Sequence, residues 1–410
     1  MENVSSSNGI EKCPKLRFPE FTEPWKATQL CNLFSKNTQK NSKGTVTNVI
    51  SNSAKNGLIH QKDYFDKDIA NADNTAGYYI ISKNDFVYNP RKSTDAPYGP
   101  ISRYTYGEDG IVSPLYLCFR GNNDVNPEYF ERFFKSSVWH RYIYMSGDSG
   151  ARHDRVSIKD ETFFEMPIHM PSNEEQKKIA AFLSLIEQKI ECQSALVENL
   201  KKYKRGVIQK AFSPSEDKCN SHFPKWKLAT FRDYFAEQSI KTSNSETTPL
   251  VSLTVEDGIT PKTERYYREF LVTKDGDNYK VIKPDWFAYN PMNAHLGAIA
   301  SNHLGYTAAV SGYYNIFSVN EPETTYFWEE FLKSYPMLIH YKLIATGTLI
   351  EKQRVHYSQF IDIQRLLPSI EEQKHLSMLF KVLNTKIKYA ENIECQLRKM
   401  RNSLLQQLFI

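Results

Sequence analysis

A segment near the middle of the chain recurs at its end, and this repetition constrains the fold more than any other feature of the sequence. Residues 171–212 align without a gap with residues 368–409, and twelve of the 42 aligned positions are identical. Weaker matches precede each copy: Trp25-Lys26 with Trp226-Lys227, and the pattern Phe-x-Tyr-Asn-Pro at 86–90 and again at 287–291. A repeat of about 200 residues is longer than a solenoid repeat and predicts two tandem domains of similar fold.

Each recurring segment has the signature of a long helix. Ser172 with Glu175, and Ser369 with Glu372, form the S-x-x-E capping box that starts a helix. No proline follows in either copy for about 38 residues, which predicts two helices of roughly 55–60 Å.

Apolar residues in these segments alternate at spacings of three and four, as in the core of a coiled coil. The first helix places Leu183, Ile186, Ile190, Val197, Leu200 and Val207 at these positions, and the second places Phe380, Leu383, Ile387, Ala390, Leu397 and Leu404. Polar residues interrupt the pattern at Gln193, Lys204, Glu394 and Arg401, where they either set the register or face solvent. Two ordinary amphipathic surface helices are the alternative, but the shared length and caps favour a paired rod.

The connectivity of the chain predicts that the two helices run antiparallel. The first helix enters the second globular region and the second helix leaves it, so a compact region brings the end of one close to the start of the other. We therefore expect an α+β chain, with two tandem, similar α/β domains separated by a long antiparallel two-helix coiled coil and related by pseudo-twofold symmetry. The expected parts are a polar N-terminal tail (1–14), a first domain (15–170), a central helix (171–212), a second domain (213–367) and a C-terminal helix (368–410).

The two globular regions have the pattern of mixed helix and sheet. Apolar runs bounded by Asn-Pro, Gly-Asp, Asp-Gly and Pro-Tyr-Gly turns predict strands at 78–81, 85–88, 113–119, 286–289 and 313–319. Short helices are expected at 126–137 and 326–335. The repeated Phe-x-Tyr-Asn-Pro sequence is either a functional loop or, as we favour, a strand that ends in an Asn-Pro turn.

Basic side chains gather in the expected loops and are the candidate nucleic-acid ligands. Interleaved Arg, Lys, Asn, Tyr and His are the side chains that bind phosphates and read base edges. The candidates are Lys83, Arg91, Lys92, Arg103, Arg152 and Arg155 in the first region, and Lys262, Arg265, His295, Lys352 and Arg354 in the second. For any single one, a solvated surface charge is the more common role. The net charge of +5 does not argue for DNA binding, because the two helical segments carry +3 each and the remainder is close to neutral.

No catalytic or metal-binding motif stands out. The sequence has no P-loop, no G-x-G-x-x-G and no HExxH. His295 and His303 lie in a glycine-rich stretch without a third ligand, so we expect no metal there. The six cysteines include no CxxC pair, which favours a reducing compartment. The lack of an 18-residue apolar window and of a signal-peptide pattern predicts a cytoplasmic protein with no membrane span.

The order of these parts resembles the specificity (S) subunit of type I restriction-modification systems. The resemblance covers nearly the whole chain and is strongest at 171–212 and 368–409, which look like the family's central and C-terminal helical regions. The Trp25 and Trp226 segments and the two Phe-x-Tyr-Asn-Pro turns look like landmarks of its two target-recognition domains. The polar tail at 1–13 is a departure, because it matches nothing in the second unit.

The resemblance implies a DNA-recognition subunit without catalytic activity. Each target-recognition domain would read one half of a bipartite site on double-stranded DNA, and the helical pair would fix the spacer between the halves. Two methylation subunits would dock on the chain and methylate adenine with S-adenosylmethionine, and two restriction subunits would be able to join them with ATP and Mg. None of these cofactors would be bound by this chain. A coiled-coil protein that bridges partners without DNA specificity, and a stand-alone DNA-modifying enzyme, are the alternative interpretations.

Overall fold

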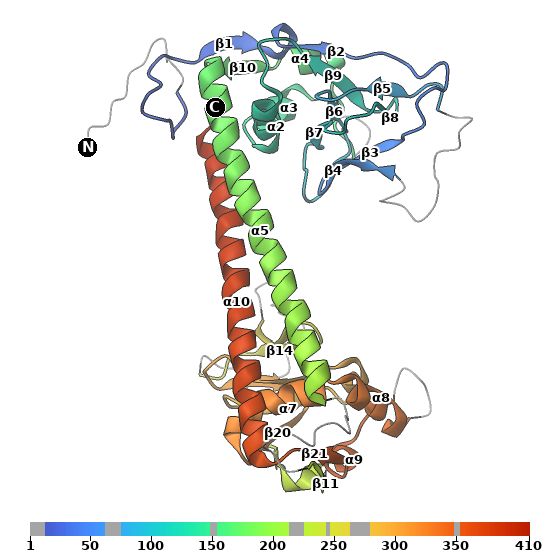
Figure 1. The fold of residues 1–410 in the computed structure, drawn as a ribbon, viewed down its shortest axis with the longest axis vertical. Coiled ribbons are helices and arrows are strands. Elements are labelled where there is room, and N and C mark those ends of the chain that lie inside the picture. Colours follow the sequence, from blue (N-terminus) through green and yellow to red (C-terminus); the bar gives the residue numbers. More distant parts are fainter. Residues whose placement is uncertain are drawn as a thin grey trace. The chain divides into compact units, whose positions relative to one another are not determined.

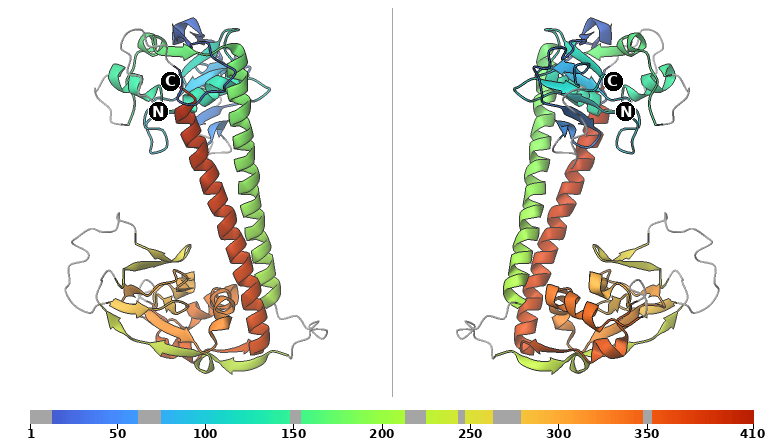
Figure 2. Two further views of the ribbon diagram at one scale, coloured as in Figure 1. Left: turned by 90° about the vertical axis from the view of Figure 1, so that its left-hand side faces the viewer. Right: turned by 90° about the vertical axis from the view of Figure 1, so that its right-hand side faces the viewer.

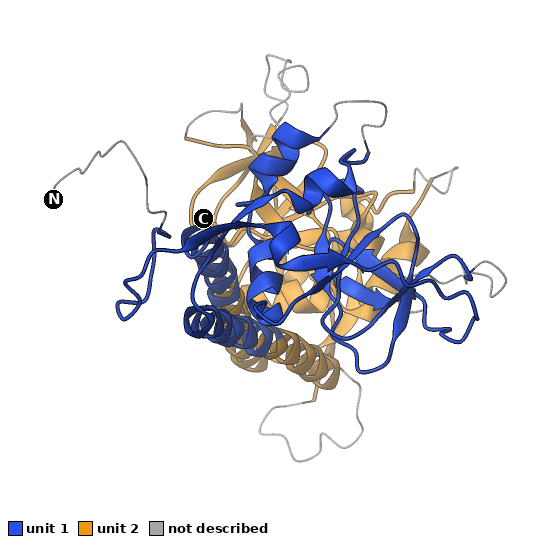
Figure 3. Cartoon of the chain, turned by 90° about the horizontal axis from the view of Figure 1, so that it is seen from above, with its two compact units in different colours: residues 1–194, 392–410 blue, residues 195–391 orange. Residues whose placement is uncertain are grey.

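The computed structural model of the protein describes residues 13–61, 75–147, 154–212, 225–242, 247–262, 279–347 and 353–410. The chain divides into two compact units (Figure 3): residues 1–194 with 392–410 form unit 1, and residues 195–391 form unit 2. Each unit therefore contains one globular region and a stretch of each long helix. The predicted tail lies outside the described residues, apart from Cys13 and Pro14.

Unit 1 is built around a four-stranded antiparallel sheet with the strand order β2-β9-β6-β7 (Figure 1). The hairpin β3–β4 and the antiparallel pairs β5–β8 and β1–β10 complete its strands. The strands are β1 (Lys26–Gln29), β2 (Phe34–Lys36), β3 (Ile50–Ser53), β4 (Gly57–His60), β5 (Tyr79–Ile81), β6 (Phe86–Tyr88), β7 (Ile101–Arg103), β8 (Gly110–Val112), β9 (Leu117–Gly121) and β10 (Pro167–Met170). The short helices are η1 (Leu30–Asn32), α2 (Pro127–Lys135), α3 (His140–Ser146) and α4 (Asp160–Phe164).

Unit 2 repeats this architecture with the strand order β12-β20-β17-β18. Its strands are β11 (Lys227–Thr230), β12 (Phe235–Gln238), β13 (Lys241–Thr242), β14 (Val251–Thr254), β15 (Gly258–Pro261), β16 (Tyr279–Ile282), β17 (Phe287–Tyr289), β18 (Ile299–Ser301), β19 (Ala308–Ser311), β20 (Asn315–Val319) and β21 (Gln364–Leu367). Its short helices are η4 (Phe231–Asp233), η6 (Ala294–Leu296), η7 (Pro322–Thr324), α7 (Thr325–Leu332), α8 (Tyr335–Ile344) and α9 (Tyr357–Ile361). The duplication in sequence is therefore a duplication of fold.

The central sheet of each unit is buried on both faces, because alternate residues of a strand point into different cores. In unit 1, Phe86 and Tyr88 of β6 lie in the core to which α2 and α4 contribute, whereas Val87 lies in the core with the β3–β4 hairpin. Phe287 and Tyr289 of β17 repeat the arrangement in unit 2. The Phe-x-Tyr-Asn-Pro sequence is thus a buried strand that ends in a turn, as we favoured.

The two long helices are α5 (Asn173–Phe212) and α10 (Ile370–Gln407). At each start a serine hydroxyl accepts a hydrogen bond from a backbone N–H: Ser172 from Glu175, and Ser369 from Glu372, both at 3.3 Å. This is the N-cap half of the capping box. No helix in the described part of the chain is long and apolar enough to cross a membrane.

The glutamates of these caps bind side chains that precede the first strand of each unit. Arg17 donates from Nε and Nη2 to the two carboxylate oxygens of Glu175, both at 2.8 Å, and Glu175 is only 1% exposed. Trp226 donates its indole N–H to Glu372 at 3.3 Å. The start of each long helix is therefore joined to the beginning of its own repeat.

The glutamine that follows each glutamate is buried and binds the proline carbonyl just before the helix. The amide of Gln176 donates to the carbonyl of Pro171 at 3.3 Å, and that of Gln373 donates to Pro368 at 3.0 Å. Gln176 also accepts from the backbone N–H of Asn126, the N-cap of α2, at 3.1 Å. A buried amide must find such partners, which gives the recurring Pro-Ser-x-Glu-Glu-Gln sequence a structural role.

Within each unit the stretches of α5 and α10 lie side by side and run antiparallel (Figures 1 and 2). In unit 2, Lys201 pairs with Glu391 at 2.8 Å, and the rings of Phe212 and Phe380 are 5.8 Å apart. From the first contact to the second, the chain advances eleven residues along α5 and goes back eleven residues along α10, as in an antiparallel pair. This is the direction that the connectivity predicted.

The residues at the predicted core positions of the two helices are all buried or half-buried. Leu183, Ile190, Val197, Phe380, Leu383 and Ala390 are buried, and Ile186, Leu200, Val207, Ile387, Leu397 and Leu404 are half-buried. All four polar interruptions are half-buried as well. Lys204 has a specific role, because it forms an ion pair with Glu330 of α7 at 2.6 Å.

Each long helix ends in the core of the other repeat. Phe409, just beyond α10, packs against Tyr129 and Phe133 of α2, with ring centroids 5.3 and 5.9 Å apart. Phe212, the equivalent residue of α5, packs against Phe327 and Phe331 of α7 at 5.8 and 5.3 Å. These contacts make the terminal phenylalanine of one repeat part of the core of the other.

The structure corrects several predicted boundaries. The helix expected at 326–335 ends at Leu332, and Tyr335 begins α8, which was not predicted; α3, α4 and α9 were not predicted either. The strand expected at 113–119 begins at Leu117, because Ser113 starts a turn whose carbonyl accepts from the N–H of Tyr116 at 3.0 Å. The strand expected at 313–319 is shortened in the same way by a turn from Ser311.

The Arg17–Glu175 pair should stabilise unit 1. Replacing Glu175 by Gln leaves the guanidinium of Arg17, whose side chain is 14% exposed, without its carboxylate. This should lower the free energy of unfolding by about 2–3 kcal/mol. Glu174→Gln is the matched control, because Glu174 is exposed in the same helical turn and loses the same interaction with the helix dipole. Urea unfolding followed by circular dichroism measures both, and equal effects would contradict the assigned role.

Candidate nucleic-acid interface

Three of the predicted basic residues come together at the turn after β6. Arg91 forms an isolated antiparallel bridge with Arg155, and the N–H of Lys92 donates to the carbonyl of Asp154 at 2.8 Å. The N–H of Val156 donates to the carbonyl of Pro90, also at 2.8 Å. Arg91 and Lys92 are exposed, and Arg155 is half-buried.

Two side-chain amides, the half-buried Asn89 and the buried Asn52, hold this turn in place. Asn89 accepts the N–H of Arg91 at 3.1 Å and donates to the carbonyl of Asn52 in the β3–β4 hairpin at 3.0 Å. Asn52 is 4% exposed and donates to the carbonyls of Val87 and Pro100 at 2.8 and 3.1 Å. The hairpin is therefore joined to the Asn-Pro turn by Asn89, and to the flanking strand residues by Asn52.

The turn before β7 also depends on one glycine. Gly99 has a φ of +81°, in the left-handed region, and an added Cβ would lie 2.2 Å from the carbonyl oxygen of Asn89. Any other residue at this position would push the two turns apart.

A groove opens between these turns and the hairpin, and we call it the hairpin groove. It has a volume of about 580 Å³, and its lining includes Asn52, Lys55, Gln61, Tyr78, Arg91, Lys92, Asp95 and Tyr116. Burial raises the pKa of Tyr116, and the nearby Arg91 and Arg155 act in the opposite direction. Flexible cations beside amide and phenol groups are the chemistry that contacts DNA phosphates and base edges.

Unit 2 has the same backbone arrangement with different side chains. Asn290 accepts the N–H of Met292 at 3.1 Å, and the N–H of Val355 donates to the carbonyl of Pro291 at 2.9 Å. Met292 stands where unit 1 has Arg91. The guanidinium of Arg354 lies 5.2 Å from the ring centre of Tyr313 and is exposed. The two repeats thus present the same turn with different chemistry.

The other predicted ligands lie elsewhere. Lys83 is exposed in the loop between β5 and β6 and does not line the hairpin groove. His295 lies in η6, and Lys262 follows β15; both are half-buried. Arg152, Arg265 and Lys352 lie outside the described residues.

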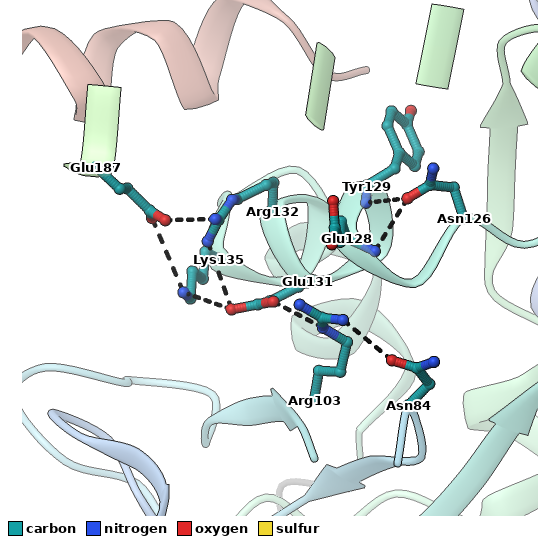
Figure 4. A network of polar contacts seen from close by, with 9 residues as sticks. All are labelled: Asn84, Arg103, Asn126, Glu128, Tyr129, Glu131, Arg132, Lys135 and Glu187. Carbon is teal, nitrogen blue, oxygen red and sulfur yellow. Dashed lines mark hydrogen bonds and ion pairs between the residues drawn. The ribbon is translucent and has the colours of Figure 1, made fainter. Parts of the chain in front are cut away.

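Arg103 is part of an ion-pair network at α2 (Figure 4). Its Nε donates to Glu131 at 2.8 Å and its Nη1 to Asn84 at 3.0 Å, while Lys135 binds Glu131 at 2.9 Å. Burial alone would raise the pKa of Glu131, but Lys135, Arg132 and Arg103 more than offset it, so the pKa is lowered. Arg103 therefore joins β7 to α2 rather than presenting a free cation.

Unit 2 has an equivalent carboxylate with a different set of partners. In Glu329 of α7, Oε1 accepts a hydrogen bond from Nζ of Lys333 at 3.0 Å. Its Oε2 accepts one from Oγ of Ser301 at 2.9 Å and lies 2.6 Å from Nε2 of His303. Ser301 and Glu329 both contact the same nitrogen of His303, so these residues lack the arrangement of a catalytic triad, in which the serine and the acid bind different ring nitrogens. Among the described residues, no group of His, Cys, Asp and Glu has the arrangement of a metal site.

Sequence reasoning missed the hairpin that forms one wall of the groove. Lys55 and Gln61 were not among the candidates, yet the Asn56-Gly57 pair is a typical hairpin-turn signal, and Gly57 has a φ of +68°. The signal was present, but β3 and β4 are too short for the apolar pattern alone to identify them.

Comparison with known proteins identifies the fold. Residues 23–202 match the family model of the type I restriction modification DNA specificity domain. The chain is similar to the crystal structure of a type I restriction-modification system S subunit from M. genitalium, with 15% identity, a TM-score of 0.58, and coverage of 97% of this chain and 99% of that one. It is also similar to a chain from a structure on complex assembly and conformational transition of the type I R-M system, with 13% identity, a TM-score of 0.54 and coverage of 95% and 98%. No curated protein matches the sequence.

Arg91 lines the hairpin groove and Lys83 does not, so the structure predicts different roles for two residues that were equal candidates in the sequence. Arg91→Gln removes a cation from the hairpin groove and should weaken DNA binding about fivefold or more, as expected for one lost phosphate or base contact. Lys83→Gln, which removes an equally exposed cation outside the groove, should change affinity less than twofold. Fluorescence anisotropy with cognate duplex, at one fixed salt concentration, measures both. Equal losses would contradict the assignment of the groove.

Proposed function

We propose that this chain, which belongs to the specificity subunits of type I restriction-modification systems, directs its partner enzymes to a bipartite and asymmetric DNA site. Each repeat reads one half of that site. The observation that carries the proposal is the duplicated sheet, β2-β9-β6-β7 and β12-β20-β17-β18, with a differently lined turn surface on each copy.

The differences between the copies favour two unlike half-sites. At the tip of the first hairpin stands Lys55, whereas the equivalent position of the β14–β15 hairpin is Glu256. After the Asn-Pro turn stands Arg91 in one copy and Met292 in the other. Because base discrimination depends on which donors and acceptors face a base edge, surfaces that differ in this way select different sequences.

The long helices act as a spacer in this proposal. A helix of 40 residues, such as α5, spans about 60 Å. Half-site spacing in DNA recognition follows from the distance between the reading elements. The number of unread base pairs between the two halves of the site is therefore a property of α5 and α10.

The helices also carry the proposed docking surface for two methylation subunits. Each has exposed apolar residues along one side, separate from those that face the other helix. On α5 they are Leu185, Leu196 and Tyr203, and on α10 they are Met378, Val382, Tyr389 and Met400; Leu379 of α10 is also exposed but lies to one side of this set. The spacings of 11 and 7, and of 4, 7 and 11, keep each set within a narrow stripe of its helix. Exposed apolar stripes of this kind are typical of sites where partner helices pack.

Catalysis belongs to the partners in this proposal. The methylation subunits supply S-adenosylmethionine chemistry on adenine, and restriction subunits, where they join the complex, supply ATP- and Mg-dependent cleavage. This chain contributes selection of the site and operates in the cytoplasm, where the DNA to be methylated lies.

The methylation pattern of a host tests the proposal directly. A strain that carries this chain with its methylation subunits should show methylated adenines within one bipartite sequence whose two halves differ and are separated by a fixed unread spacer. Single-molecule sequencing of the genome measures this. The matched control is the same strain with the gene for this chain deleted, which should lack the pattern. A continuous or palindromic motif would contradict the proposal.

The helices should determine the spacer length. Removal of one heptad from the middle of α5 and the facing heptad of α10 keeps the apolar register and shortens the pair by about 10 Å. The methylated motif should then have a spacer about three base pairs shorter, with both halves unchanged. An unchanged spacer in the sequenced motif would show that the helices are not the ruler.

A further inference from the structure

Unit 1 contains a second and larger groove, which we call the helix groove. It has a volume of about 730 Å³ and lies between the tip of the β3–β4 hairpin, the α2–α3 segment, and stretches of α5 and α10. Ala54, Lys55, Asp95 and Pro100 line both this groove and the hairpin groove. The hairpin tip is therefore the common rim, and the candidate nucleic-acid interface continues past it to the long helices.

Arg401 of α10 lines the helix groove, and comparison with the aligned residue of unit 2 shows how its charge differs in setting. The repeat alignment equates Arg401 with Lys204 of α5. Lys204 is neutralised, because it forms an ion pair with Glu330 of α7 at 2.6 Å. In unit 2 this helix cation thus serves to join α5 to the globular region.

In unit 1 the charge of the partner is reversed. The position equivalent to Glu330 is Arg132 of α2, which cannot form an ion pair with Arg401 and instead binds Glu187 of α5 at 2.5 Å. Arg401 donates from Nε and Nη2 only to the side-chain oxygen of its neighbour Asn402, at 3.2 and 2.9 Å. In the part of the chain that the structure describes, no carboxylate forms an ion pair with Arg401.

The ion-pair network of α2, most of whose residues line the groove, does not supply a compensating negative charge. Three cations, Arg103, Arg132 and Lys135, share two carboxylates, Glu131 and Glu187, at distances from 2.5 to 3.9 Å (Figure 4). One positive charge remains in excess. Glu131 stays ionised in this setting, because the three cations lower its pKa despite its burial.

The rest of the lining adds to this excess. Lys55 and Arg401 contribute two further positive charges, and Asp95 removes one. Burial lowers the pKa of His140, so this side chain is neutral at pH 7 and offers hydrogen bonds without charge. A polar groove with an excess of positive charge and one guanidinium free of carboxylates is suited to an anion.

We infer that the helix groove of unit 1 binds a phosphate of the DNA backbone and that Arg401 is its main ligand. The inference deepens the proposed function and rests on it, because the groove continues the surface that would read one half-site. A phosphate contact fixes the position of the duplex but carries no sequence information. Unit 2, where Glu330 neutralises Lys204, lacks this ligand, so the two repeats hold the DNA backbone differently.

Arg401→Gln tests the inference in the complex of the full chain with its methylation subunits. Affinity for cognate duplex should fall three- to tenfold, and the slope of log affinity against log salt should decrease by about 0.9, the value for one lost phosphate contact. The preference for cognate over scrambled duplex should not change. Arg401→Lys keeps the charge and should restore the salt slope.

Arg398→Gln is the matched control. Arg398 lies one turn earlier on α10, is exposed, and is paired with Glu394 at 2.7 Å, but it does not line the groove. It should leave affinity and salt slope unchanged. If R401Q behaves like R398Q, or if R401Q releases a methylation subunit on gel filtration while the salt slope stays constant, the phosphate site is wrong. Absence of any sequence preference in the unaltered complex would instead contradict the proposed function.

Discussion

The rest of the structure depends on one constraint: the end of each long helix completes the aromatic core of the other repeat. Phe409 completes the core of the first repeat against Tyr129 and Phe133, and Phe212 completes that of the second against residues of α7. Neither repeat buries its aromatic core without a helix segment from the other half of the chain. Because burial of large aromatic side chains dominates core stability, each helix must extend as far as its terminal phenylalanine. The gap-free alignment of 171–212 with 368–409 keeps Phe212 and Phe409 equally far from their helix caps.

A shared scaffold with different charges gives the two repeats separate properties. The equivalent carboxylates Glu131 of α2 and Glu329 of α7 each join the central sheet to a helix, but the partner is Arg103 in one repeat and His303 in the other. Differences of this kind leave the strand order unchanged while they alter the surface. A duplicated reader can therefore acquire a second specificity without a new fold.

The sequence predicted the features that depend on local pattern and missed those that depend on distant contacts. The caps and apolar spacing placed both long helices to within three residues of their ends, because these signals lie within the helices themselves. The short helix α3 has no side-chain cap and was not foreseen. Arg91 and Arg103 were indistinguishable in sequence, since only the fold brings Glu131 to Arg103 and leaves Arg91 on an open groove. The grooves themselves arise from contacts such as that of Asn89 with Asn52. These residues are far apart in the sequence, so the pattern of apolar residues does not predict their contact.

The central claim is that each repeat is an independent reader on a common helical frame. Replacement of residues 15–170 by the corresponding domain of a specificity subunit with a known, different target tests it most directly. The genome of a strain with this hybrid, its methylated adenines mapped by sequencing, should show one half of the site replaced and the other half and the spacer retained. A motif in which both halves change, or in which neither does, would contradict the account.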